Sequence, residues 1–260
     1  MSGRKCWICG ATPATEEHVW PRWLKSITSH RTSSYRMGIA DDQSTWREWN
    51  GATFEHTARV LCKPCNSRLG ELEGRVRPIA EDLIASRATS IDADHQPILA
   101  SWLYKTGLMV ASTIKQEAAS LPHEHYSELK GEFDLPPGSV VWVGLLDRRV
   151  NEAALHIQRF GWWDRQAAEP VHCGGYILVL GIGELASIIG VLDTRQSPAS
   201  ADMEFPFILD GPGVGRLLRI WPPSTHYGHR WPPSATIPGA ALAGITSAFA
   251  RWAESKGQAR

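Results

Sequence analysis

Four cysteines near the start of the chain have the spacing of a metal-binding site. Cys6 and Cys9 form one Cys-x-x-Cys pair, and Cys62 and Cys65 form a second. This spacing lets both thiolates of a pair face one ion from a tight turn, so two pairs supply the four sulfur ligands of tetrahedral zinc. Because four protein ligands leave no open position, the pattern predicts a structural zinc ion, and any reaction must take place beside it.

Three further side chains could carry out that reaction. Glu17 and His18 lie between the two cysteine pairs, and Asn66 directly follows the second pair. A neutral imidazole can accept a proton from water at about pH 7. Carboxylate and amide oxygens are hard ligands that suit Mg²⁺ or Mn²⁺. The sequence therefore indicates a proton acceptor and two ligands for a catalytic metal ion next to the zinc site.

The cysteine count favours zinc over disulfide bonds. The chain has 5 cysteines, an odd number, and residues 1–5 carry no apolar signal segment. We therefore expect a reducing, cytoplasmic location. The fifth cysteine, Cys173, is interpreted as a small residue of the core.

The elements that must position these residues can be predicted from local patterns. Pro21 favours extended backbone before it, so Glu17 and His18 are expected to end a short strand. Residues 57–61 predict a second strand that leads into Cys62. A helix is expected from about Asn66, with apolar residues spaced by threes and fours: Leu69, Leu72, Val76, Ile79 and Leu83. The polar residues 26–53 form a long excursion between the strands.

These motifs resemble those of the HNH endonucleases, in the subgroup stapled by four zinc-binding cysteines. The resemblance covers about residues 5–80 and rests on the two cysteine pairs, on Glu17-His18-Val19-x-Pro21, and on Asn66 after the last cysteine. It implies a treble-clef-like ββα-metal module that cuts DNA. It also implies that His18 is the general base and that Glu17 and Asn66 bind a catalytic Mg²⁺ or Mn²⁺.

The chain departs from the family pattern at two positions. Glu17 stands where the family has an aspartate, and the extra methylene changes its reach. Thr57 stands where the family has an asparagine that orients the base, so Asn50 and His56 are further candidates for that role. Glu73 lies two turns beyond Asn66 on the same helix face and is an additional candidate ligand, although a solvated carboxylate is the commoner outcome.

Charge is balanced over the whole chain, with 27 basic and 27 acidic residues, so a nucleic-acid partner must use a local patch. The phosphate-binding candidates are all basic and lie near the two motifs: Arg22, Arg59, Lys63 and Arg68. Lys105 lies in the apolar stripe of a predicted helix. It is expected either to pair with a carboxylate or to reach a phosphate in the cleft.

The remaining sequence predicts an α+β region. Helical spacing covers about residues 96–115, and five β-type runs follow, which predict a mixed antiparallel sheet of five or six strands: Val140–Leu146, Ala154–Trp163, Tyr176–Leu180, Ser187–Leu192 and Arg216–Trp221. Ala240–Ala253 is predicted to be a closing helix. We therefore expect a nuclease module over residues 1–90 and an accessory α+β domain over residues 91–260.

The accessory region has no catalytic pattern of its own, so it is expected to position substrate, to bind a protein partner or to form a homodimer. DNA is the expected substrate, and RNA is an alternative. The rival hypothesis is a catalytically inactive zinc-stapled module that holds nucleic acid or protein, and Thr57 is its best support.

Overall fold

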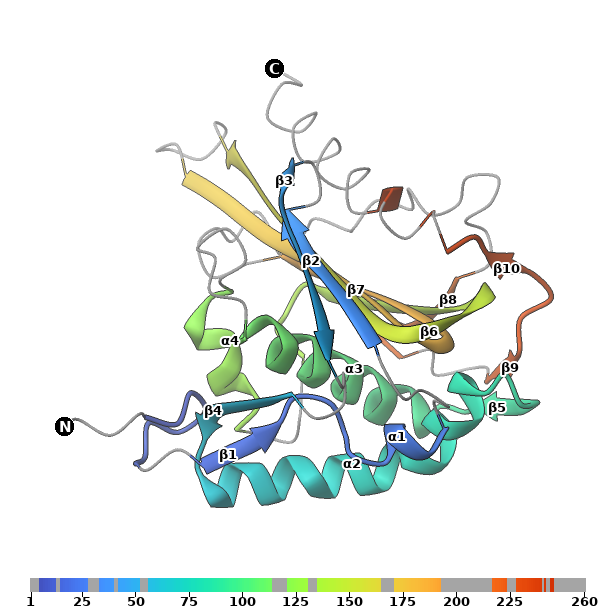
Figure 1. Cartoon of the computed structure of the whole chain (residues 1–260), viewed down its shortest axis with the longest axis horizontal. Helices are drawn as coiled ribbons and strands as arrows, with labels where there is room; N and C mark the ends of the chain where they lie inside the picture. Colours follow the sequence, from blue (N-terminus) through green and yellow to red (C-terminus); the bar gives the residue numbers. More distant parts are fainter. Residues whose placement is uncertain are drawn as a thin grey trace.

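The structure is a computed structural model in which the long helix α3 (His95–Ala111) lies between a curved sheet and a second long helix, α2 (Lys63–Ile84) (Figure 1). It describes residues 5–12, 15–27, 33–39, 42–51, 56–113, 121–130, 135–164, 171–192, 217–223, 228–239, 241, 244 and 245. The architecture combines helices and sheets in separate layers, as expected for an α+β protein. None of the described helices has the length and hydropathy to cross a membrane.

The elements around the cysteines have the predicted order of strand, strand and helix. Strand β1 (Thr15–His18) pairs antiparallel with β4 (Thr57–Leu61), and His18 lies opposite Thr57. Helix α2 follows at once and begins at Lys63, inside the second cysteine pair, rather than near Asn66. Pro64 explains this early start, because the first turn of a helix leaves its amides without internal partners and accepts proline there.

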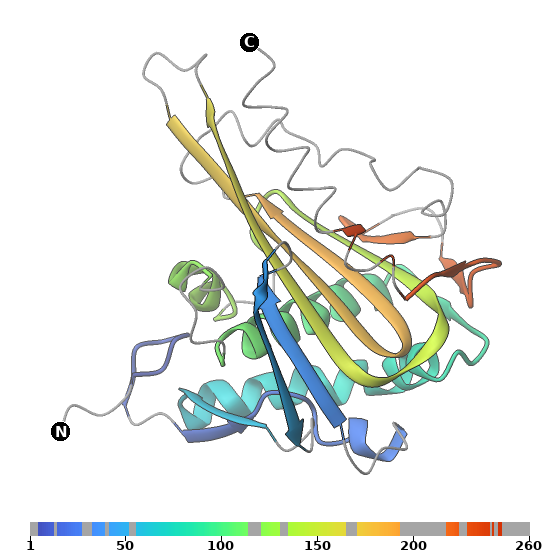
Figure 2. The same ribbon diagram turned by 45° about the horizontal axis from the view of Figure 1, so that its top comes forward.

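Between β1 and β4 the chain forms the one-turn helix α1 (Leu24–Ile27) and a β-hairpin. The hairpin consists of β2 (Ser33–Ile39) and β3 (Asp42–Gly51), and β2 lies beside the long strand β6 (Ser139–Asp164) (Figures 1 and 2). The polar excursion predicted for residues 26–53 therefore contains regular structure.

Four of the predicted β runs merge into two long strands, β6 (Ser139–Asp164) and β7 (Val171–Leu192), which pair with each other along their length (Figure 2). The turn-type residues that separate the runs in the sequence are absorbed by register shifts between Leu145 and Ala154. Short strands β8 (Leu218–Trp221) and β10 (Thr236–Ile237) add to β6, so the described sheet has four strands rather than the five or six predicted. Most of the helix predicted at 240–253 lies outside the described residues.

The apolar core continues across the domain boundary predicted at residue 90. That boundary falls inside β5 (Thr89–Ile91), which pairs with β9 (His229–Trp231) near the other end of the chain. One cluster of buried side chains extends from Cys6 through α2 and α3 to Trp231. The helix α3 is buried almost all round because it contacts α2 on one side and the sheet on the other. One described core cluster therefore spans both predicted domains, and a second cluster lies within the predicted accessory region.

A tight contact fixes the end of α2 against the sheet. Gly183, within β7, has φ +59°, and a Cβ placed there would lie 2.8 Å from the carbonyl oxygen of Ile84. Only glycine adopts this backbone conformation without cost and leaves room for the approach. A glycine that reads in sequence as a simple turn signal therefore positions the helix that carries Asn66 and Glu73.

A candidate active site beside the cysteine cluster

The four cysteine side chains meet at one point. The Sγ atoms of Cys6, Cys9, Cys62 and Cys65 all lie within 4.8 Å of one another. In a tetrahedral zinc site with Zn–S bonds of about 2.3 Å, neighbouring sulfurs are about 3.8 Å apart, so the cluster needs little adjustment to hold the ion. Three of the cysteines are buried and Cys9 is exposed. The structure therefore confirms that the four cysteines can hold a metal ion such as zinc.

Local backbone geometry explains why both pairs close into turns. The amide of Gly10 donates to the carbonyl of Cys6 at 2.8 Å, and Gly10 has φ +74°. The amide of Asn66 donates to the carbonyl of Cys62 at 2.9 Å in the first turn of α2. The second turn thus continues directly into the helix, which fixes Asn66 next to the metal-binding cluster.

The thiols themselves show why a cation is needed there. Burial works to raise the pKa of Cys6, but hydrogen bonds from the backbone of Cys62, Cys9 and Ile8 outweigh it and lower that pKa to about 7. Burial and its neighbouring thiols raise the pKa of Cys65. Without an ion, a second thiolate would lie against the first, whereas a divalent cation stabilises all four thiolates together.

The cysteine cluster is attached to both halves of the chain. The amide of Trp7 donates to the carbonyl of Val60 in β4 at 2.8 Å. The indole of Trp7 packs edge-on against Tyr126 of helix α4 (His123–Glu128), with ring centroids 4.7 Å apart. The first cysteine turn is therefore held between the β1–β4 strand pair, which carries His18, and helix α4 of the predicted accessory region.

Glu17 and Asn66 are brought together beside this cluster. The Asn66 side chain hydrogen-bonds the Glu17 carboxylate, and Lys105 and Glu73 both interact with that carboxylate electrostatically. Lys105 is fully buried and forms an ion pair with Glu73. One strand and two helices thus contribute two carboxylates, an amide and an ammonium group to a single polar site.

The electrostatics of Glu17 differ from those of a surface carboxylate. Burial raises its pKa from 4.5 to about 7, and repulsion from Glu73 acts in the same direction. Lys105, the Asn66 hydrogen bond and Arg22 oppose the rise. The carboxyl therefore lies in a place where its negative charge is incompletely balanced. A divalent cation would supply that balance, and the carboxylate and amide oxygens are the donors that Mg²⁺ and Mn²⁺ prefer.

His18 faces the other side of β1. Side chains alternate along a strand, and His18 interacts electrostatically with Glu16, two residues before it on the same strand. Nε of Arg22 donates to Nε2 of His18 at 3.3 Å. The structure thus places His18 next to Glu17 along the chain, at the end of β1.

The candidates for orienting His18 have other partners or lie outside the described side chains. Thr57 is paired with His18 in the ribbon, yet its hydroxyl donates to Oε1 of Glu16 at 2.8 Å. The carbonyl of His56 accepts from the amide of Val19 at 2.9 Å, so His56 positions the backbone just after His18. Asn50 belongs to β3, and its side chain lies outside the described residues.

The predicted phosphate-binding residues fall into two groups. Arg22, Arg59 and Lys63 are exposed, and Arg59 forms only a solvent-exposed ion pair with Glu16 at 3.6 Å. Exposed pairs of this kind are weak, so Arg59 can exchange Glu16 for a phosphate. These three remain candidates for contact with nucleic acid.

Lys105 and Arg68 both have partners within the protein. The side chain of Lys105 is 0% exposed and its ammonium pairs with Glu73, which is the carboxylate-paired alternative of the two predicted for it. Arg68 donates to the carbonyl oxygens of Leu129, at 2.6 Å, and Lys130, at 2.5 Å. Its guanidinium therefore satisfies carbonyls at the end of α4 and joins that helix to α2.

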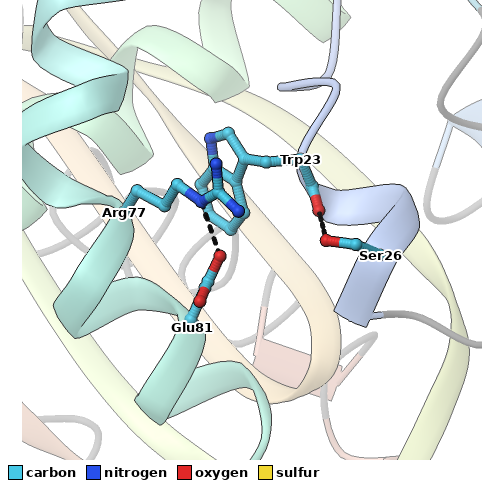
Figure 3. A network of polar contacts seen from close by, with 4 residues as sticks. All are labelled: Trp23, Ser26, Arg77 and Glu81. Carbon is cyan, nitrogen blue, oxygen red and sulfur yellow. Dashed lines mark hydrogen bonds and ion pairs between the residues drawn. The ribbon is translucent and has the colours of Figure 1, made fainter.

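Trp23 packs against side chains of both long helices. Its indole lies 5.9 Å from the guanidinium carbon of Arg77, which in turn bonds Glu81 at 2.6 Å (Figure 3). On α3, Trp102 packs against the same indole with ring centroids 5.8 Å apart. These contacts fix α1, and with it the chain that follows His18 and Arg22, against α2 and α3.

Three buried side chains, joined by short polar contacts that the sequence did not predict, hold α4 in place. Nδ1 of His125 lies 2.7 Å from the hydroxyl of Tyr176, and that hydroxyl lies 3.1 Å from the hydroxyl of Tyr104. Burial raises the pKa of Tyr176 well above its usual value, so it stays protonated. The three residues are far apart in the chain and no short motif joins them, which is why only the tertiary structure identifies them.

Comparisons of the chain with protein-family models, with curated proteins and with solved structures find no match.

Proposed function

We propose that this protein is a metal-dependent endonuclease that hydrolyses phosphodiester bonds in DNA. The observation that carries the proposal is the meeting of Glu17 and Asn66 beside the four-cysteine cluster, with His18 adjacent at the end of the same strand. The HNH-type motifs supply these residue types in this order. A pair of hard oxygen ligands next to a histidine suits phosphodiester hydrolysis, which needs a proton acceptor and a cation.

In this proposal Glu17 and Asn66 hold one Mg²⁺ or Mn²⁺. The ion, when bound, neutralises negative charge that develops on the phosphate and on the leaving oxygen. His18 accepts a proton from water as the water oxygen bonds to phosphorus, and the bond from phosphorus to the leaving sugar oxygen breaks. Arg22, Arg59 and Lys63 contact neighbouring phosphates.

The contact between Arg22 and His18 gives the proposal a further step. Because Nε2 of His18 accepts from Arg22 in this structure, that nitrogen cannot also accept a proton from water. A phosphate offers the guanidinium an anionic partner that can accept two parallel hydrogen bonds, whereas the neutral imidazole offers a single lone pair. Substrate binding therefore draws Arg22 from the ring to the phosphate and frees His18 to act as the base.

The test is cleavage of plasmid and single-stranded DNA by the zinc-loaded protein with Mg²⁺, with Mn²⁺ and with neither. Wild type should cut only with a divalent ion, and His18→Ala should lose the activity while keeping its zinc content and circular dichroism. His95→Ala is the matched control, because His95 is a partly exposed histidine at the start of α3 with no place in the proposed site. Cleavage that survives His18→Ala would remove the mechanism.

One observation favours a second candidate, a zinc-stapled module that binds nucleic acid without cutting it. The hydroxyl of Thr57, at the position of the family's orienting asparagine, is directed to Glu16 and not to the His18 ring. Binding without cleavage, unchanged by His18→Ala and lost with Arg22→Ala or Arg59→Ala, would support this alternative. An RNA substrate would appear as cutting of RNA in the same assay.

A further inference from the structure

A buried cation from outside the predicted nuclease module lies at the candidate metal site. Lys105 belongs to α3, which follows the module in sequence, and its side chain is 0% exposed. Its ammonium forms an ion pair with Glu73, whose side chain is 16% exposed, on α2. Lysine is almost never fully buried unless it is paired, so this contact accounts for its presence.

The same ammonium also acts on Glu17. Lys105 attracts the Glu17 carboxylate and Glu73 repels it, while Asn66 donates a hydrogen bond to it. With both carboxylates ionised, Glu17, Glu73 and Lys105 together carry a single net negative charge, and the exposed Arg22 acts on Glu17 more weakly than Lys105 does. A divalent ion that binds Glu17 and Asn66 must therefore enter a site that already contains a fixed cation.

We propose that Lys105 sets the divalent-metal affinity of the Glu17–Asn66 site, by lowering it through charge repulsion, and that Glu73 serves to hold Lys105 in place rather than to bind the metal. This inference rests on the proposed function, because it assumes that Glu17 and Asn66 bind the ion. Its consequence is that the free protein binds metal weakly. A substrate phosphate adds the negative charge that the site needs to retain the ion.

Three variants should differ in their affinity for Mn²⁺, in an order that a purely structural ion pair would not give. Lys105→Met removes the cation and leaves two carboxylates, so Mn²⁺ should bind at least about tenfold more tightly. Glu73→Gln leaves Lys105 unbalanced, so Mn²⁺ should bind at least about tenfold more weakly. The double variant Lys105→Met/Glu73→Gln keeps the net charge of wild type, and its affinity should lie within about threefold of wild type.

The experiment is a Mn²⁺ titration of the zinc-loaded full chain in the absence of nucleic acid, followed by the loss of the free Mn²⁺ signal in electron paramagnetic resonance. Zinc content and circular dichroism check each fold. Removing both partners of a buried ion pair is tolerated much better than removing one, so the double variant is the one most certain to fold. If Lys105→Met does not fold, the comparison of Glu73→Gln with the double variant decides the question.

Two results would overturn the inference. The first is a Lys105→Met protein that keeps its fold but binds Mn²⁺ no more tightly than wild type. The second is a double variant that loses Mn²⁺ binding, which would show that Glu73 is itself a ligand. Either result leaves the proposed function standing if His18-dependent cleavage persists. Wild type that binds no Mn²⁺ outside the cysteine cluster would overturn the inference and the metal-dependent mechanism together.

Discussion

Replacing Glu17 by glutamine should make the protein without Mg²⁺ or Mn²⁺ more stable at pH 8 and not at pH 5. Burial raises the pKa of Glu17 from 4.5 to about 7. Between these two values the folded protein binds more protons than the unfolded chain, so its free energy of unfolding falls as the pH rises through this window. Above about pH 7 the folded state carries the full cost of a poorly solvated carboxylate.

The size of the effect follows from the two pKa values. The rise from 4.5 to about 7 corresponds to roughly 3 kcal/mol, which is an upper limit, because solvent reaches the partly exposed carboxyl group and screens its charge. We expect Glu17→Gln to gain roughly 1–3 kcal/mol at pH 8, or roughly 3–9 °C in Tm for a chain of this size. At pH 5 wild-type Glu17 is protonated when folded, so the gain should nearly vanish.

The assay is urea and thermal unfolding at both pH values, with one equivalent of zinc and no Mg²⁺ or Mn²⁺. Glu16→Gln is the matched control, because the neighbouring Glu16 is exposed, and a hydrogen bond from Thr57 together with Arg59 lowers its pKa. That variant should show no gain at pH 8. Equal effects of Glu17→Gln at the two pH values, or a loss of stability at pH 8, would refute the reasoning. The stabilised variant should also lose divalent-metal binding and cleavage, since a strained charge is often retained for function.

Four other predictions concern the scaffold around the site and its exposed arginine. Removing zinc with a chelator, or substituting Cys62→Ser, should lower Tm markedly. A Tm that is the same with and without the chelator would argue against a structural ion. Arg68→Ala should cost about 1–3 kcal/mol in urea unfolding and leave the salt dependence of DNA binding unchanged, because its guanidinium serves α4. Arg22→Ala should do the reverse, with little loss of stability and a salt slope reduced by about one; equal slopes would remove Arg22 from the phosphate contacts. Gly183→Ala should destabilise the protein by about 2 kcal/mol or more in the same unfolding assay, because of its positive φ and its contact with Ile84; a cost below about 0.5 kcal/mol would contradict this.

Sequence patterns predicted the parts of the site that depend on neighbouring residues. The two Cys-x-x-Cys pairs specify a metal cluster because their short spacing closes a turn around an ion. The apolar spacing along α2 specified the helix and its buried face, since that pattern is read over a few turns of one segment. Pro21 likewise marked the end of β1. For these features, the local chain contains the whole physical reason.

Other features required the packing of distant segments. From the sequence, Lys105 could either pair with a carboxylate or contact a phosphate. Its ion pair with Glu73 forms because α3 packs against α2. Arg68 read as a phosphate contact because its neighbours are basic, whereas its carbonyl partners come more than sixty residues later. The long pairing of β6 with β7 was missed because each strand contains turn-type residues, and pairing with a partner strand overrides such local preferences.

The sequence by itself determined the metal-binding cysteine cluster, because two Cys-x-x-Cys pairs at short spacing have few other uses, and it determined which imidazole, carboxylate and amide groups are available beside it. The tertiary structure alone decided how those groups are balanced electrically. The raised pKa of Glu17, the buried charge of Lys105 and the contact of Arg22 with His18 arise where separate elements meet. Burial and charge–charge distance are properties of that packed arrangement, and no local pattern encodes them.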